Sequence, residues 1–159
     1  MENKRPFLVF YLDHRKFALD LDVVDRVVPA AETTPLVHES KHVRGLINIS
    51  GDVVPVVDTR LLLGAPSREM ELEDRFILAL AHGRRVALHV DRVEGVAMLP
   101  AGLVNWPQAG SGRETEEFPA GSAPVATVLG DIVLVQDVDV LARAASLEEN
   151  QISNGANSA

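Results

Sequence analysis

The chain has 159 residues and a mass of 17.2 kDa, with 47% hydrophobic and 24% charged residues, a composition that fits one soluble globular domain or two small lobes sharing a core. Its 15 Lys and Arg against 23 Asp and Glu give a net charge of −8, so it has no overall attraction to nucleic acid or to an anionic membrane. The absence of cysteine excludes disulfides, cysteine zinc sites and thiol catalysis. Because no apolar run could cross a bilayer and the N-terminus lacks a signal-peptide pattern, we expect a cytoplasmic protein.

The start of the chain has the pattern of strands. An apolar run covers Phe7–Leu12, and after polar residues the side chains of Phe17–Leu21 alternate between apolar and small or polar, as in a half-buried strand. This pattern predicts a hairpin over Phe7–Leu21 with its turn near Asp13–Arg15. The next segment, Val23–Val28, fits either a helical turn or a strand, and Pro29 ends it.

A second strand-rich stretch covers Val43–Asp58. The run Val53–Val57 predicts a strand, and because Pro55 cannot donate to a ladder we expect an edge strand or a bulge there. A short helix is predicted over Thr59–Leu63, with Gly64 at its C-terminal cap. The polar, acidic residues Ala65–Asp74 form a connector.

Past this connector the pattern starts again. A shift of 69 lays residues 7–28 on 76–97 without a gap, and a shift of 79 lays Gly51–Leu62 on Gly130–Leu141. Valine positions of two strand-rich segments can match by chance, but the shifts also superpose glycine, aspartate and phenylalanine positions. This agreement favours an internal duplication of the sequence. Two copies are too few for a solenoid and suit two small β-barrels side by side. We expect barrels over about 7–64 and 76–142 within one domain, 6–143, and a partly disordered tail over 144–159.

One motif points to a different chemistry. His38-Glu39-Ser40-Lys41-His42 matches the zinc-protease pattern H-E-x-x-H, which requires a helix so that both imidazoles lie on one face. Pro35 and Gly45 leave room for barely two helical turns, and the apolar periodicity of a buried helix is missing. A zinc hydrolase therefore remains a remote alternative, and we expect no catalytic residues, no metal and no cofactor.

The stretch Val43–Asp58 resembles the CheW family of chemotaxis coupling proteins, whose pattern is V-x-G-x-x-N-L-R-G-x-V-x-P-V-x-D-L. The first hairpin, Val90–Val93 and Leu129–Leu141 are similar to other family segments, so the resemblance covers roughly residues 6–143. It implies a mainly β fold of two intertwined five-stranded SH3-like barrels with a few short helices. It also implies a non-catalytic, cytoplasmic adaptor at chemoreceptor clusters, which joins the tip of a methyl-accepting chemoreceptor to the regulatory domain of a CheA-type histidine kinase.

The sequence departs from this family at three positions, and one of them is Pro124, where the family has a glycine ahead of its last strand. The family arginine of N-L-R-G is Ser50, and the usual glutamate of V-x-E-[VI] is Arg26. Ser cannot replace a five-donor guanidinium, and a reversed charge excludes a former partner. The alternative is therefore an accessory protein that binds receptor but has lost productive kinase binding. By resemblance, the partner-binding residues are Val24, Arg26, Val27, Gly45, Asn48, Ser50, Gly51 and Val93.

Overall fold

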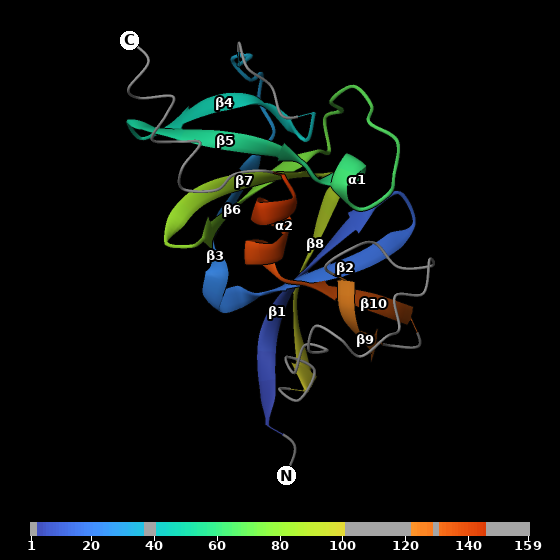
Figure 1. Cartoon of the computed structure of the whole chain (residues 1–159). Coiled ribbons are helices and arrows are strands. Elements are labelled where there is room, and N and C mark those ends of the chain that lie inside the picture. Colours follow the sequence, from blue (N-terminus) through green and yellow to red (C-terminus); the bar gives the residue numbers. More distant parts are fainter. Residues whose placement is uncertain (1–2, 37–40, 101–121, 129–130, 146–159) are drawn as a thin grey trace.

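The fold consists of two five-stranded sheets, seen in a computed structural model that describes residues 3–36, 41–100, 122–128 and 131–145 (Figure 1). In sheet A the strand order is β8-β1-β2-β10-β9, and in sheet B it is β3-β6-β7-β5-β4. Of the two α-helices of the described residues, α1 (Thr59–Leu62) follows β5 directly and α2 (Val138–Ala144) follows β10 after Asp137. The strands are β1 (Lys4–Leu12), β2 (Arg15–Asp20), β3 (Val24–Pro29), β4 (Val43–Ile49), β5 (Asp52–Asp58), β6 (Arg75–Ala81), β7 (Arg84–Val90), β8 (Arg92–Pro100), β9 (Ser122–Val128) and β10 (Asp131–Gln136).

The two halves of the sequence exchange strands. The shift of 69 relates β1, β2 and β3 to β6, β7 and β8, and the shift of 79 relates β4, β5 and α1 to β9, β10 and α2. The first half gives β1 and β2 to sheet A but β3, β4 and β5 to sheet B, and the second half does the converse. The sequence halves 7–64 and 76–142 therefore do not correspond to the two sheets, and the sheets are intertwined as the fold class predicts.

Most of the local predictions are confirmed. The first hairpin pairs β1 with β2 around Asp13 and His14, and β3 ends at Pro29. The helix α1 ends in a Schellman motif, because the Gly64 amide donates to the Leu61 carbonyl and the Ala65 amide to the Arg60 carbonyl. Gly64 has a φ of +87°, which favours glycine.

The expectation of an edge strand or a bulge at Pro55 is wrong. Strand β5 lies between β7 and β4, and the irregular step of its ladder with β4 lies between Val43 and Gly45 rather than at the proline. Proline is tolerated because the parallel ladder to β7 covers only Val56–Asp58. Pro55 lies just before that ladder.

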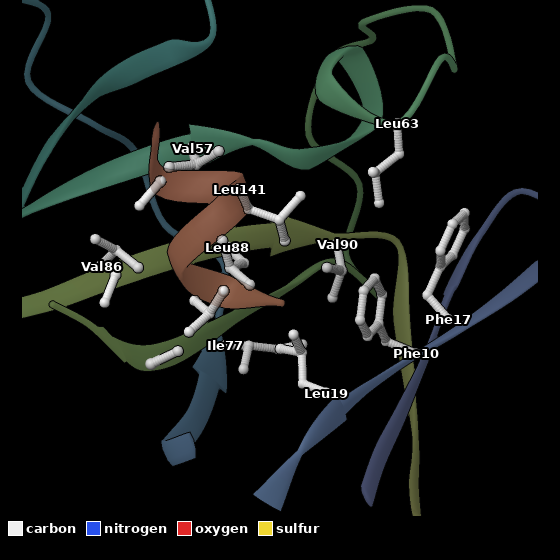
Figure 2. Close-up of a cluster of buried hydrophobic side chains, with 14 of the residues drawn as sticks. Phe10, Phe17, Leu19, Val57, Leu63, Ile77, Val86, Leu88, Val90 and Leu141 are labelled. Atoms are coloured by element: carbon white, nitrogen blue, oxygen red, sulfur yellow. The ribbon is translucent and has the colours of Figure 1, made fainter. Parts of the chain in front are cut away.

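Strand β2 is buried on both faces, so the half-buried reading of it is also wrong. Phe17 and Leu19 face a central core between the sheets, while Ala18 faces a smaller core inside sheet A with Phe7 and Val9. The central core draws on both sheets, on Leu63 and on α2, whose Leu141 lies among residues of β5 and β7 (Figure 2). A third core lies inside sheet B and contains Val54, Val56, Phe76, Leu78 and Ala87. Alternate residues of these strands thus pack into the central core and into the core of their own sheet, and the shared central core joins the two sheets.

Candidate partner-binding surface

A charged row crosses one end of sheet B. Arg85 on β7 forms ion pairs of 3.2 Å with Asp25 on β3 and 3.3 Å with Asp52 on β5. Leu80 on β6 is the cross-strand partner of Arg85 and is 45% exposed. Every second residue of a strand lies on the same face, so Leu80 shares a face with Leu78, and Asp52 shares one with Val54. Because Leu78 and Val54 belong to the core inside sheet B, the row covers one end of that core.

The repeat places the same arrangement on sheet A. Lys16 on β2 lies 2.9 Å from Asp131 and 3.7 Å from Glu94, and the Tyr11 hydroxyl donates to Glu94 at 3.1 Å. The two repeat shifts relate these groups one by one to those of sheet B: Lys16 to Arg85, Glu94 to Asp25, Asp131 to Asp52 and Tyr11 to Leu80. The hydrogen bond to the Asp131 carboxylate raises the pKa of Lys16.

Exposed apolar side chains accompany both rows, again at related positions. In sheet B, Val27 is 36% and Val53 66% exposed; in sheet A, their equivalents Val96 and Ile132 are 58% and 64% exposed. An ion-pair row bordered by exposed valine, leucine or isoleucine has the chemistry of a protein–protein contact, with apolar anchors and polar groups that set specificity. We name the first group the Arg85 surface: Asp25, Arg26, Val27, Ser50, Gly51, Asp52, Val53, Leu80 and Arg85. The second group is the Lys16 surface: Tyr11, Lys16, Glu94, Val96, Asp131 and Ile132.

Part of the predicted set lies together at the Arg85 surface. Arg26 and Val27 follow Asp25 on β3, and Ser50 and Gly51 precede Asp52 in the β4–β5 turn. Because Arg85 pairs with both Asp25 and Asp52, it joins these two segments. The Arg26 side chain is half exposed and lies 3.6 Å from Asp25.

Two other predicted residues face the interior. Val24 on β3 and Val93 on β8 are partly buried, and both pack against the central core. Val93 belongs to sheet A, so the structure does not bring it to the Arg85 surface. Their described contacts are those of packing residues.

The glycine of the motif has a packing role in this structure. Gly45 has a φ of +149°, and a Cβ there would lie 2.5 Å from the Thr34 carbonyl oxygen and 2.9 Å from the Thr33 hydroxyl oxygen. Thr34 approaches this closely because it exchanges two backbone hydrogen bonds of 2.8 Å with Leu46. No side chain fits at this position.

The asparagine of the motif stabilises a tight turn. Ser50 and Gly51 join β4 to β5 with φ values of +52° and +91°, the signs that a type I′ hairpin turn requires. The Asn48 side-chain oxygen accepts a hydrogen bond of 2.8 Å from the Gly51 amide. The turn presents Ser50, the departure from the family pattern, as an exposed residue.

The sequence reasoning missed Arg85, Asp25, Asp52 and Leu80. A usable signal was present, because the shifts of 69 and 79 that reveal the repeat also match basic Lys16 with Arg85 and acidic Asp25 with Glu94. Carboxylates and a cation repeated at one relative position predict a shared ion-pair row.

A second polar cluster, which we name the connector network, holds the segment between α1 and β6. Arg60, with a side chain only 8% exposed, donates to Asp91 at 2.5 Å, to Asp13 at 2.9 Å and to the Pro66 carbonyl at 2.8 Å. Arg68 pairs with Asp91 at 3.1 Å and bidentately with buried Asp74, which also contacts His89 Nε2 at 2.7 Å. The network joins the β1–β2 turn of sheet A to strands β6 and β7 of sheet B.

Burial and hydrogen bonding act in opposite directions inside this network. Burial alone would raise the pKa of Asp74, but hydrogen bonds from Arg68, the Glu71 amide and His89 outweigh it and lower that pKa. Burial lowers the pKa of His89, against the opposing effect of its Asp74 contact. His89 is therefore a neutral imidazole that donates to an ionised Asp74 at neutral pH.

The structure describes only part of the segment that matches the zinc-protease pattern. His38 and Glu39 lie outside the described residues, but His42 lies in the turn directly before β4 and not in a helix, and its carbonyl accepts from the Asp58 amide. The described part of the chain contains no group of three or more His, Asp or Glu side chains placed to hold a metal ion. Its longest helix, α2, has seven residues, and none is long and apolar enough to cross a membrane.

Comparison with known proteins agrees with the fold and the motif. Residues 6–146 match the family described as "CheW-like domain". The chain is 25% identical over 142 residues to "Chemotaxis protein CheW" of Thermotoga maritima, covering 89% of this chain and 90% of that one, and 29% identical over 92 residues to the same-named protein of Rhizobium meliloti, covering 58% and 59%. The crystal structure of the scaffolding protein TtCheW from Thermoanaerobacter tengcongensis superposes with a TM-score of 0.77 at 21% identity, over 87% of this chain and 92% of that one. The chain therefore belongs to the CheW-like domain family.

Proposed function

We propose that this protein is an adaptor that couples a methyl-accepting chemoreceptor to a CheA-type histidine kinase. The observation that carries the proposal is the Arg85 surface, whose ion-pair row and exposed apolar side chains offer a protein contact apart from the junction between the sheets. A body that presents two separate contact surfaces can hold two partners at once, which is the physical requirement of an adaptor.

Family membership supports this reading and argues against chemistry. CheW-like proteins are scaffolds of chemotaxis and not enzymes, and this chain is one of them. The zinc hydrolase through His38, Glu39 and His42 has no support from the family or from the turn that holds His42. We further propose that residues 6–143 act as one domain at receptor clusters in the cytoplasm.

The Arg85 surface is the contact that we assign to the regulatory domain of the kinase. Its exposed Val53 and Leu80 would supply apolar area, and Arg85, already oriented by two carboxylates, would supply directional hydrogen bonds. The receptor tip, a helical hairpin, would bind beside the junction between the sheets. Ser50 and Arg26 lie at the kinase contact, so they bear on coupling and not on receptor binding.

A second candidate function follows from those two residues. Ser50 is exposed where the family has arginine, and Arg26 places a cation where the family has a carboxylate. A partner that presents a basic group to this position would meet like charge and bind less well. The protein would then occupy receptor without driving the kinase.

Receptor-controlled kinase autophosphorylation, measured with and without this protein, separates the two functions. The adaptor raises the rate, whereas the accessory protein leaves it flat or lowers it by competing with a genuine coupling protein. If the two departures cause a loss of coupling, the double variant Ser50→Arg, Arg26→Glu should raise the rate severalfold above wild type. The control Arg15→Ala changes an exposed cation at the start of β2, in the other sheet from the Arg85 surface, and should have no effect. A double variant with wild-type activity would contradict this explanation.

A further inference from the structure

Strand β3 contains a β-bulge that turns two neighbouring charged residues to the same face of sheet B. In the ladder of β3 with β6, Val24 pairs with Ala79 and Arg26 pairs with Leu78, so Asp25 is an extra residue between them. Directly opposed residues of an antiparallel pair share a face, so Arg26 lies on the face of Leu78. In a regular strand, two consecutive residues would point to opposite faces.

This face is the one that carries the charged row. Leu80 shares the face of Leu78, and Arg85 is the cross-strand partner of Leu80. Arg85 pairs with Asp25 at 3.2 Å, so Asp25 also reaches this face. The bulge therefore places the Arg26 guanidinium beside Leu80 and the row instead of on the opposite face.

The repeat contains the same bulge without the arginine. In sheet A the ladder of β8 with β1 is interrupted at Glu94, which the shift of 69 relates to Asp25. The residue after Glu94 is Gly95, the equivalent of Arg26. A bulge of this kind thus forms with no side chain at its following position, and the fold does not account for an arginine there.

The Arg26 guanidinium has donors available for another molecule. Its side chain is 50% exposed, and its Nε lies 3.6 Å from the Asp25 carboxylate, beyond hydrogen-bond distance. Among the residues that the structure describes, Arg26 donates no hydrogen bond. Arg85 differs, because Asp25 and Asp52 both pair with it. A free guanidinium matches a carboxylate, which accepts two parallel hydrogen bonds from its planar fork.

We propose that Arg26 is a specificity-determining residue of the Arg85 surface and that it binds a carboxylate of the kinase regulatory domain. The inference rests on the proposed function and adds the chemistry of one partner group, an aspartate or glutamate that approaches beside Leu80. Leu80, which is 45% exposed, would shield this pair from water and so strengthen it. A kinase that presents lysine or arginine at this place would meet like charge and be rejected.

Calorimetric titration of the full chain with the regulatory domain of the CheA-type kinase from the same organism tests the proposal. Arg26→Gln should weaken binding about tenfold, the loss expected for one charge-assisted contact. Arg26→Glu should weaken binding further, and both losses should shrink at high salt. Because Arg26 is half exposed and its ion pair with Asp25 is long, the thermal midpoints of both variants should stay at the wild-type value.

The matched control is Arg15→Glu. It makes the same change of net charge as Arg26→Glu, but at the start of β2 in the other sheet. It should leave the affinity for the kinase domain unchanged, because overall charge is not the cause of the expected loss. An equal loss in Arg15→Glu and Arg26→Glu would overturn the inference.

Charge reversal in the partner identifies the carboxylate. Variants of the kinase domain, each with one exposed acidic residue replaced by lysine, are titrated against the Arg26→Glu chain, and one of them should restore binding. Unchanged affinity of Arg26→Gln, tighter binding of Arg26→Glu, or no rescue by any partner variant would overturn the inference and leave the adaptor function standing. A wild-type chain that does not bind the kinase domain would contradict the proposed function and this inference with it.

Discussion

At the scale of single residues, the motif positions divide into those that build the fold and those that face solvent. Gly45 and Asn48 are explained by contacts inside the chain, with Thr34 and with the Gly51 amide. Ser50 and Arg26 point to solvent, and no fold requirement accounts for their identity. Motif residues therefore mark a binding surface only where the fold does not already require them.

Gly45→Ala should destabilise the protein by about 3 kcal/mol, because its methyl group would collide with the Thr34 carbonyl and φ is +149°. Gly51→Ala is the matched control: φ is +91° but no atom lies within 4 Å, so only the backbone cost of about 1 kcal/mol applies. Urea unfolding measures both. Equal losses for the two variants would show that the close approach of Thr34 carries no energy.

At the scale of elements, the two charged rows and the connector network differ in how much their ion pairs contribute to stability. Each row lies at one end of a sheet and is partly exposed, so its ion pairs add little to stability. In the connector network Arg60 and Asp74 are buried and hold the connector in place. Removing one partner of these ion pairs would leave a buried charge without a counter-charge. Polar residues thus stabilise the connector, while the Arg85 surface stays free for a partner.

The network also predicts a pH dependence. His89 has a pKa below that of an unfolded histidine, so the unfolded chain binds a proton first and stability falls as the pH drops below about 6.5. The lowered pKa of Asp74 removes further stability at more acid pH. His89 faces Asp74, Arg44, Asp58 and the edge of the Phe76 ring.

His89→Gln isolates the histidine contribution, because the amide can still donate to Asp74 but does not titrate. Unfolding free energies of wild type and variant should lie closer together at pH 5 than at pH 7, since only the wild type loses the histidine contribution on acidification. Parallel curves over this range would contradict the assignment.

At the scale of the whole molecule, the sequence predicted the repeat, the first hairpin and α1, because periodicity and turn residues act locally. It did not predict which strands share a sheet, since exchange depends on long-range pairs such as β2 with β10. Nor did it predict the Arg85 surface, whose members come from β3, β5, β6 and β7. Family resemblance supplied the fold class that periodicity alone could not.

Strand exchange means that neither half should fold alone. A fragment of residues 1–66 would carry β1 and β2 without their sheet partners β8 and β10, and would leave the central core half built. Its NMR spectrum should show the narrow amide dispersion of an unfolded chain. Mixing it with residues 67–159 should restore wide dispersion. A well-dispersed spectrum from the first fragment alone would contradict the exchanged topology.

NMR titration of isotope-labelled protein shows whether one body binds two partners on separate surfaces. The kinase regulatory domain should shift amides of the Arg85 surface, and the receptor tip should shift those at the junction between the sheets. The second partner should produce its own shifts with the first still bound. Shifts from the receptor tip alone would contradict the adaptor account and leave an accessory protein that occupies receptor without reaching the kinase.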